Sequence, residues 1–209
     1  MELENFSSKL LKEAVDEFAK LPGIGRKTAL RLVLHLLNRD KEEVNQFGNT
    51  IIRLRNEIKR CKSCNMISDN ELCPICANNN RDHSLICVVE NSRDVMAIES
   101  THQYQGIYHV LGGIISPMDG IGPSDLNIEN LQNKIEDNIV QEIVLALSTT
   151  MEGDTTNFYL YKRFRDYPVK ITTIARGISV GNDLEFADEL TLGKSIVNRT
   201  LFENTLSSQ

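Results

Sequence analysis

Apolar residues recur every three or four positions through the first sixty residues of the chain. This spacing places them on one face of a helix, and it predicts helices over 7–20, about 27–38 and about 41–60. Between the first two lies the run Leu21–Gly25, of sequence Leu-Pro-Gly-Ile-Gly, through which neither a helix nor a strand continues. The amino-terminal part is therefore predicted to be helical, with a tight turn between its first two helices.

The pattern changes at residue 84, where short continuous apolar runs begin to alternate with helix-like stretches. An uninterrupted apolar run of about five residues is typical of a buried parallel strand. The predicted strands are 85–89, 107–111, 142–147 and 169–175, and the predicted helices are 92–101, 128–138, about 153–165 and about 188–199. This alternation predicts an α/β layer with a mainly parallel sheet.

Charge is unevenly distributed along the chain, whose formal net charge is −6. Residues 1–60 hold 12 Lys and Arg against 9 Asp and Glu, whereas the remaining residues hold 11 basic and 20 acidic side chains. The overall sign excludes a generic polyanion-binding protein. The basic amino-terminal part nevertheless suggests that this part meets an anion.

The sequence has the features of a cytoplasmic protein. No run approaches the roughly 18 consecutive apolar residues of a membrane-spanning helix. The acidic start, Met1–Asn5, lacks the basic-then-apolar order of a signal peptide. Cysteines are kept reduced in the cytoplasm, where closely spaced sets tend to bind metal or act as thiols.

Glycines at positions 23 and 25 permit a tight hairpin and leave backbone N–H groups uncovered. A helix is predicted to begin directly afterwards, so its free N–H groups and the positive end of its dipole face the same place. The basic residues around this turn are Lys20, Arg26, Lys27 and Arg31, with no acid from Lys20 to Leu37. These residues together predict a phosphate-binding site; an ordinary helix corner with a solvated basic face is the alternative.

Four of the five cysteines form two Cys-x-x-Cys pairs. Cys61 and Cys64 make the first pair and Cys73 and Cys76 the second, with eight residues between the pairs. Two such pairs can close a tetrahedral thiolate site with no open position, which is typical of structural zinc. An iron–sulfur cluster is the alternative. The metal is expected to staple a segment too short to hold its own core.

Two further interpretations concern the basic residues beside these cysteines and the fifth cysteine. Lys59, Arg60 and Lys62 leave open a direct contact between the cysteine segment and DNA. The fifth cysteine, Cys87, lies inside a predicted strand and is interpreted as a packed core thiol.

Carboxylates follow two of the predicted strands. Glu90 and Asp94 follow the first strand of the predicted sheet, and Glu152 and Asp154 follow its strand at 142–147. If these strands are neighbours, Glu90, Glu152 and Asp154 converge at the edge where α/β folds place their sites. Such a cluster could bind Mg²⁺ or a basic partner surface. Isolated surface acids are the alternative.

These features resemble known modules. The glycine turn between helices resembles the helix–hairpin–helix motif, which binds the DNA backbone without reading its sequence. The acids after two strands resemble those of a Toprim domain, where one Glu and an Asp-x-Asp pair hold magnesium for phosphoryl transfer. Glu152 replaces the first Asp of that pair, and no convincing nucleophile for strand cleavage is present.

The order of the three modules resembles that of the RecR family. The stretches that look like this family are 21–37, 61–76, 86–90, 108–113, 115–118, 149–154, 177–181 and 184–189. The resemblance covers essentially the full chain. It implies a multidomain α+β fold with a helix–hairpin–helix domain over 1–60, a small four-cysteine zinc finger over 61–76, a Toprim domain over 84–178 and an oligomerisation segment over 179–209.

The resemblance also implies a function. RecR proteins work in recombinational repair, where they act with RecO, and in some systems RecF, to load recombinase onto single-stranded DNA coated by single-strand binding protein. The family forms ring-like dimers and tetramers, and Lys27 and Arg31 match its DNA-contacting positions. The acidic tail is reminiscent of a Walker B motif, but no Gly-x-x-x-x-Gly-Lys-Ser/Thr loop accompanies it, so ATP hydrolysis is not expected. Because the Asp-x-Asp pair is altered and a nucleophile is missing, the Toprim acids are not expected to be catalytic either.

Two other functions remain as alternatives. One is a Mg²⁺-dependent Toprim nuclease or topoisomerase-like enzyme that cuts or joins DNA. The other is a structural adaptor that contacts proteins and never DNA. The basic flank of the glycine turn favours DNA over the adaptor, which has no need of it.

Overall fold

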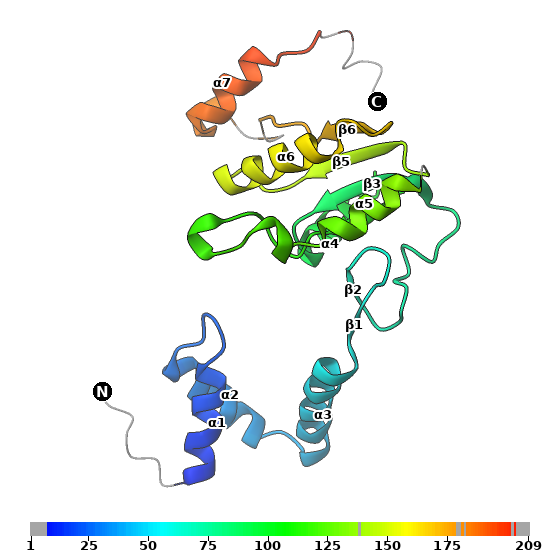
Figure 1. Ribbon diagram of the computed structural model, residues 1–209. Coiled ribbons are helices and arrows are strands. Elements are labelled where there is room, and N and C mark those ends of the chain that lie inside the picture. Colours follow the sequence, from blue (N-terminus) through cyan, green and yellow to red (C-terminus); the bar gives the residue numbers. More distant parts are fainter. Residues whose placement is uncertain (1–7, 138, 179–180, 182, 202, 204–209) are drawn as a thin grey trace. The chain divides into compact units, whose positions relative to one another are not determined.

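The computed structural model describes residues 8–137, 139–178, 181, 183–201 and 203. The chain divides into two compact units, Met1–Ile58 and Lys59–Gln209 (Figure 1). Each unit contains a hydrophobic cluster of its own. The cysteine segment, predicted as a separate small domain, shares the second unit with the α/β layer.

The first unit consists of the helices α1 (Lys9–Ala19), α2 (Arg26–Leu37) and α3 (Lys41–Glu57). Val15 from α1 packs with Ala29 and Val33 from α2 in a small core. The first helix begins after Ser8, whose hydroxyl accepts a hydrogen bond from the N–H of Leu11 at 3.3 Å. The predicted helices of this part therefore form, and the turn between the first two closes a helical hairpin.

The second unit contains a parallel sheet. Its strands are β3 (Asp82–Val89), β4 (Gly106–Val110), β5 (Glu142–Ala146) and β6 (Lys170–Thr173). Their order is β4-β3-β5-β6, and Cys87 on β3 lies opposite Tyr108 on β4 and Val144 on β5. The predicted parallel sheet is confirmed. Because β3 and β5 are neighbours, the carboxylates predicted to converge follow adjacent strands.

Helices cover both faces of the sheet. These helices are α4 (Ser92–Glu99), α5 (Ile128–Glu136) and α6 (Met151–Phe164). Leu131 of α5 and Phe164 of α6 share one core cluster with Ile86 of β3. Val95 of α4 belongs to another cluster with Cys87, which points to the opposite face because side chains alternate along a strand. Burial raises the pKa of the Cys87 thiol to about 12, as suits a packed core residue.

The cysteine segment contains a small hairpin. Its strands are β1 (Lys59–Arg60) and β2 (Ile67–Ser68), which pair antiparallel. The sequence predicts only an irregular segment here, because strands of two residues are too short to show a periodic pattern. Met66 and Ile75 from this segment pack against the core cluster on the α4 side of the sheet.

The remaining elements are η1 (Pro117–Asp119), η2 (Pro123–Asp125), η3 (Leu184–Phe186) and α7 (Glu189–Val197). The last helix, α7, falls where a helix is predicted. Residues 179, 180, 182, 202 and 204–209 of the predicted carboxyl-terminal segment lie outside the described residues. Across the described ranges, the structure has no helix with the length and apolarity to span a membrane.

Candidate metal centre and nucleic-acid interface

Four cysteine sulfurs meet beside the β1–β2 hairpin. The Sγ atoms of Cys61, Cys64, Cys73 and Cys76 all lie within 4.8 Å of one another, and no cysteine among them is more than 9% exposed. A tetrahedral zinc site with Zn–S bonds of about 2.3 Å has S–S edges of about 3.8 Å. The sulfurs of Cys64 and Cys73 are 3.5 Å apart. The donor atoms and the size of the site therefore fit zinc.

Backbone N–H groups donate hydrogen bonds to two of these sulfurs. The N–H of Cys73 donates to Sγ of Cys61 at 3.3 Å, and the N–H of Cys76 donates to Sγ of Cys73 at 3.4 Å. The hydrogen bond between Cys64 and Cys73 lowers the pKa of the Cys73 thiol and raises the pKa of the Cys64 thiol, so without a metal this pair favours one thiolate, at Cys73. Donors to sulfur stabilise the deprotonated form, which is the form that binds metal.

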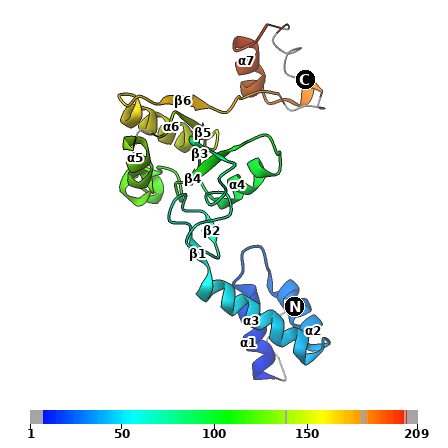
Figure 2. The same ribbon diagram turned by 90° about the vertical axis from the view of Figure 1, so that its right-hand side faces the viewer.

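The cysteine segment is anchored to the edge strand β4. Asn65 adopts the left-handed conformation, with φ 63°, and its N–H donates to the carbonyl of Cys61 at 2.8 Å. The side-chain amide of Asn65 donates to the carbonyl of Val110 at 3.2 Å, and the N–H of Val110 donates to the carbonyl of Cys64 at 2.8 Å. The cysteine segment is thereby attached to the strand at the edge of the sheet, whose place in the second unit can be followed in Figure 2.

The glycine turn of the first unit is open to an approaching anion. Gly23 has φ 78°, a conformation that favours glycine over other residues. A Cβ placed on Gly23 or Gly25 would meet nothing within 4 Å, so the space around the turn is open. Gly25 is the N-cap of α2 and has no side chain with which to cap it. The N–H groups of Arg26 and Lys27, in the first turn of α2, are thus available to a ligand.

The basic residues at this turn fall into two groups. Lys20 pairs with Glu17 at 2.6 Å, and Arg26 pairs with Asp16 at 2.8 Å. Within the described part of the chain, Lys27 and Arg31 have no acidic partner.

The sequence analysis considered only the acid-free stretch that begins at Lys20. It therefore missed Asp16 and Glu17, the two acids of α1 that pair with basic residues of the turn. The signal for Glu17 was present, since Glu17 and Lys20 are three residues apart on one helix. Nothing in the sequence indicated the contact of Asp16 with Arg26, which forms only when the two helices pack.

The predicted acidic residues have different surroundings. Asp94 caps α4, where its carboxylate accepts a hydrogen bond from the N–H of Asn91 at 3.0 Å. Asp154 forms an ion pair with Arg176, and the hydrogen bond from this guanidinium lowers the pKa of the Asp154 carboxyl. Glu90 is half-buried and Glu152 is exposed, and neither has an ion-pair partner among the described residues.

A magnesium site at these carboxylates stays a prediction. Among the described residues, the cysteines are the one group of three or more metal-ligating side chains close enough to share an ion. Arg176, which lies after β6, was missed by the sequence interpretation because nothing links a residue 22 positions away to Asp154 until the sheet forms.

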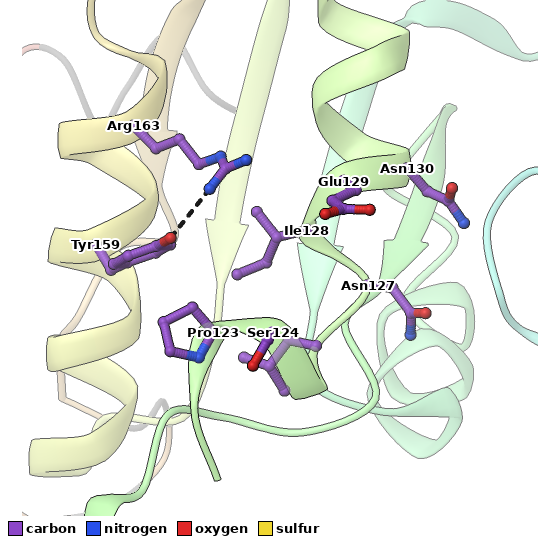
Figure 3. Close-up of a pocket in the computed structure, with 9 residues that line it drawn as sticks. Pro123, Ser124, Asn127, Ile128, Glu129, Asn130, Tyr159 and Arg163 are labelled. Carbon is purple, nitrogen blue, oxygen red and sulfur yellow. Dashed lines mark hydrogen bonds between the residues drawn. The ribbon is translucent and has the colours of Figure 1, made fainter.

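A separate cavity of about 610 Å³ lies in the α/β layer (Figure 3). Tyr159 and Arg163 of α6 line it opposite Ile128 and Glu129 at the start of α5. Arg163 donates hydrogen bonds to the Tyr159 hydroxyl at 3.0 Å and to the side-chain carbonyl of Gln132 at 2.6 Å. The predicted site residues do not line this cavity.

Comparisons with known proteins cover the same parts of the chain. Family models match the RecR helix-hairpin-helix over 11–54, the RecR four-cysteine zinc finger domain over 58–78, the Toprim domain over 84–175 and the RecR C-terminal segment over 177–200.

Relatives match over nearly their whole length. The Recombination protein RecR of Bacteroides thetaiotaomicron is 63% identical over 203 residues, which are 97% of this chain and 99% of that protein. That of Flavobacterium johnsoniae is 58% identical over 97% of this chain and 98% of its own length. That of Porphyromonas gingivalis is 54% identical over 98% of this chain and 99% of its own length.

A helical hairpin, a four-cysteine zinc finger and a Toprim domain define a class of multidomain zinc proteins of DNA metabolism. The chain belongs to the RecR family, and a role in recombinational DNA repair follows from that membership. The predicted fold class and the structural zinc are confirmed.

Proposed function

We propose that this protein is a non-catalytic recombination mediator in the cytoplasm, where it binds DNA without sequence preference. In this role it acts with RecO and RecF to load recombinase onto single-stranded DNA. Family membership supports the process, and the open, basic hairpin of the first unit supports the contact with DNA.

The availability of Lys27 and Arg31 carries the DNA-binding proposal. Both are exposed residues of α2, one turn apart on the same face, beside uncapped N–H groups. Phosphate oxygens are matched both by such N–H groups and by basic side chains. Lys20 and Arg26 contribute less, because each would first have to leave an acidic partner. Phosphate contacts of this kind position DNA and carry no sequence information.

A single copy should bind DNA weakly, because the chain as a whole carries a net charge of −6. Several copies in a homodimer or homotetramer would raise the affinity through effective concentration, since each bound hairpin holds the others near the strand. An assembly of this kind suits a protein that contacts a long coated strand and whose described residues show no base-reading element.

The test of DNA binding is the double change Lys27→Ala with Arg31→Ala. Affinity for single-stranded DNA should fall equally across sequences, and the salt slope should fall by about 1.4, that is about 0.7 for each lost phosphate contact. The control is Lys9→Ala with Lys12→Ala, which removes the same charge from the opposite end of α1. Unchanged affinity and slope in the folded hairpin variant would place the DNA site elsewhere, with the basic residues beside the zinc finger next to be tested.

The partnership is tested in a reaction that contains coated single-stranded DNA, recombinase and RecO, with or without RecF. The protein should speed filament formation, and the hairpin variant should not. Equal filament formation without the protein would contradict the mediator role and leave the DNA-binding result unaffected.

The absence of catalysis is proposed from the surroundings of the Toprim acids. Asp154 is held by Arg176 and Asp94 by the start of α4, so only Glu90 and Glu152 remain without such a partner among the described residues. Supercoiled plasmid incubated with protein and Mg²⁺ should stay supercoiled. Nicking or relaxation that disappears in Glu90→Gln would support the nuclease or topoisomerase-like alternative instead.

A further inference from the structure

A buried ammonium group has no hydrogen-bond partner in the second unit. The Nζ atom of Lys134, on α5, is shielded from solvent and makes no hydrogen bond within the described residues. Buried lysines are rarely charged without a compensating group, because desolvation of an ammonium is costly. Such a side chain is either held as the neutral amine or compensated by a negative group that the protein atoms alone do not display.

The position of α5 is fixed beside the cysteine segment. The carbonyl of Val110 accepts hydrogen bonds from two sides, from Asn65 of the cysteine segment at 3.2 Å and from Asn127, the N-cap of α5, at 3.4 Å. The N–H of the same residue donates to Cys64. The end of β4 is therefore a junction at which α5 and the metal centre both meet the sheet.

The surroundings of His109 show that this junction is shielded from solvent. This residue is fully buried, and its Nε2 is 2.7 Å from the carbonyl of Asn127, to which it donates. Burial, followed by the positive charge of Lys134, lowers the pKa of His109 to about 4. At neutral pH this imidazole is uncharged, so Lys134 is left as the cation of the junction.

The negative charge that acts on Lys134 comes from the cysteines. Burial lowers the pKa of Lys134, and the charges of all four cysteines oppose that shift, that of Cys76 most strongly. Four thiolates around one Zn²⁺ leave a net charge of about −2 in a buried site. A buried centre of that charge and a buried ammonium compensate each other's charge. Either group buried without the other would be costly.

We propose that Lys134 is the buried counter-cation of the zinc centre, so that its ammonium tightens zinc binding by balancing the excess charge of the tetrathiolate. The affinity of the zinc finger for its metal is then set partly by a helix of the neighbouring Toprim domain. By reciprocity, bound zinc stabilises the packing of α5 on the sheet.

The test compares three purified, folded variants for their zinc affinity in competition with a chromophoric chelator. Lys134→Met keeps the length and apolar stem without the charge, and it should weaken zinc binding about 10- to 100-fold, as loss of outer-shell partners does. Lys134→Arg keeps the charge and should retain most of the affinity. Lys162→Met, an exposed change on α6, should bind zinc as the parent chain does.

A second measurement separates this role from simple packing. Urea unfolding of Lys134→Met is followed with zinc bound and after the metal has been stripped. The variant should be less stable than the parent with zinc and equally or more stable without it, because an uncompensated buried charge is then removed. An equal loss of stability in both states, or unchanged zinc affinity, would overturn the proposal. Lys134→Gln replaces Lys134→Met in both assays if the latter does not fold.

Discussion

Among the ion pairs of the described residues, that between Arg81 and Glu99 is the most buried. Arg81 donates to Glu99 at 2.9 Å, and the hydroxyl of Tyr108 donates to the same carboxylate at 2.7 Å. The side chains of Arg81 and Glu99 are 16% and 27% exposed, whereas those of Arg53 and Glu57 are 71% and 61% exposed. Water screens the second pair, so only the first is expected to contribute measurable stability.

Replacement of Glu99 by Gln tests this difference. Arg81 lowers the pKa of Glu99 below its ordinary value of 4.5, so the stabilisation is present above that pH and is lost as the pH falls through the lower, folded-state pKa. Glu99→Gln should reduce the free energy of unfolding by about 2 kcal/mol near neutral pH. In urea unfolding at a series of pH values, the difference from the parent should shrink on acidification, while Glu57→Gln should match the parent throughout. A difference for Glu99→Gln that does not change with pH would contradict the assignment.

The connection between β5 and α6 leaves no room for a side chain larger than that of glycine at position 153. Thr150 is the N-cap of α6, and its hydroxyl accepts a hydrogen bond from the N–H of Gly153 at 3.1 Å. A Cβ on Gly153 would lie 2.0 Å from the carbonyl oxygen of Ser148. The helix can therefore approach the end of the strand only with glycine at this position, which sits between Glu152 and Asp154.

Gly153→Ala should consequently destabilise the second unit by about 1–3 kcal/mol through overpacking against backbone. Gly48→Ala is the matched control, because Gly48 lies in α3, where an added Cβ would meet nothing within 4 Å. Alanine favours a helix over glycine by up to about 1 kcal/mol, so the control should be no less stable than the parent. Unfolding in urea, followed by circular dichroism, measures both. A stable Gly153→Ala protein would mean that the junction can relax by moving α6.

At the scale of the whole molecule, the division into two compact units predicts that a destabilising change in one unit leaves the other unit folded. The core of the first unit is formed by helix residues such as Val33, and that of the second by the sheet and its helices. The metal centre belongs to the second unit and bonds to β4.

Hydrogen exchange read by mass spectrometry tests this separation. Val33→Ala, which removes buried volume worth about 2 kcal/mol, should speed exchange in α1 and α2 and leave the sheet protected. Cys64→Ser, or removal of zinc by a chelator, should speed exchange in the cysteine segment and at β4 and leave the first unit unchanged. About one zinc per chain is expected in the parent, and exchange that rises everywhere in either case would show that the units unfold together.

The sequence by itself determined the features that depend on neighbours along the chain. The helices followed from a 3.6-residue periodicity, because one face is buried, and the strands of the parallel sheet followed from short uninterrupted apolar runs, because both faces of that sheet are covered. The zinc ligands followed from two Cys-x-x-Cys turns, since each turn presents both sulfurs to one ion. The glycine turn followed from the glycines at 23 and 25, which permit a tight hairpin, and Gly23 does adopt a positive φ.

Only the tertiary structure decided which charged groups are free and which are paired. Asp154 meets Arg176 where the neighbouring strands β5 and β6 end, Arg26 meets Asp16 between helices, and the ammonium of Lys134 is buried in the second unit. Each of these depends on residues far apart in sequence that packing brings together, and the energy of a charge depends on the solvent and charges around it in space. Periodicity and spacing carry no information about those surroundings, which is why the metal ligands were predicted fully and the partners of the acidic and basic residues were not.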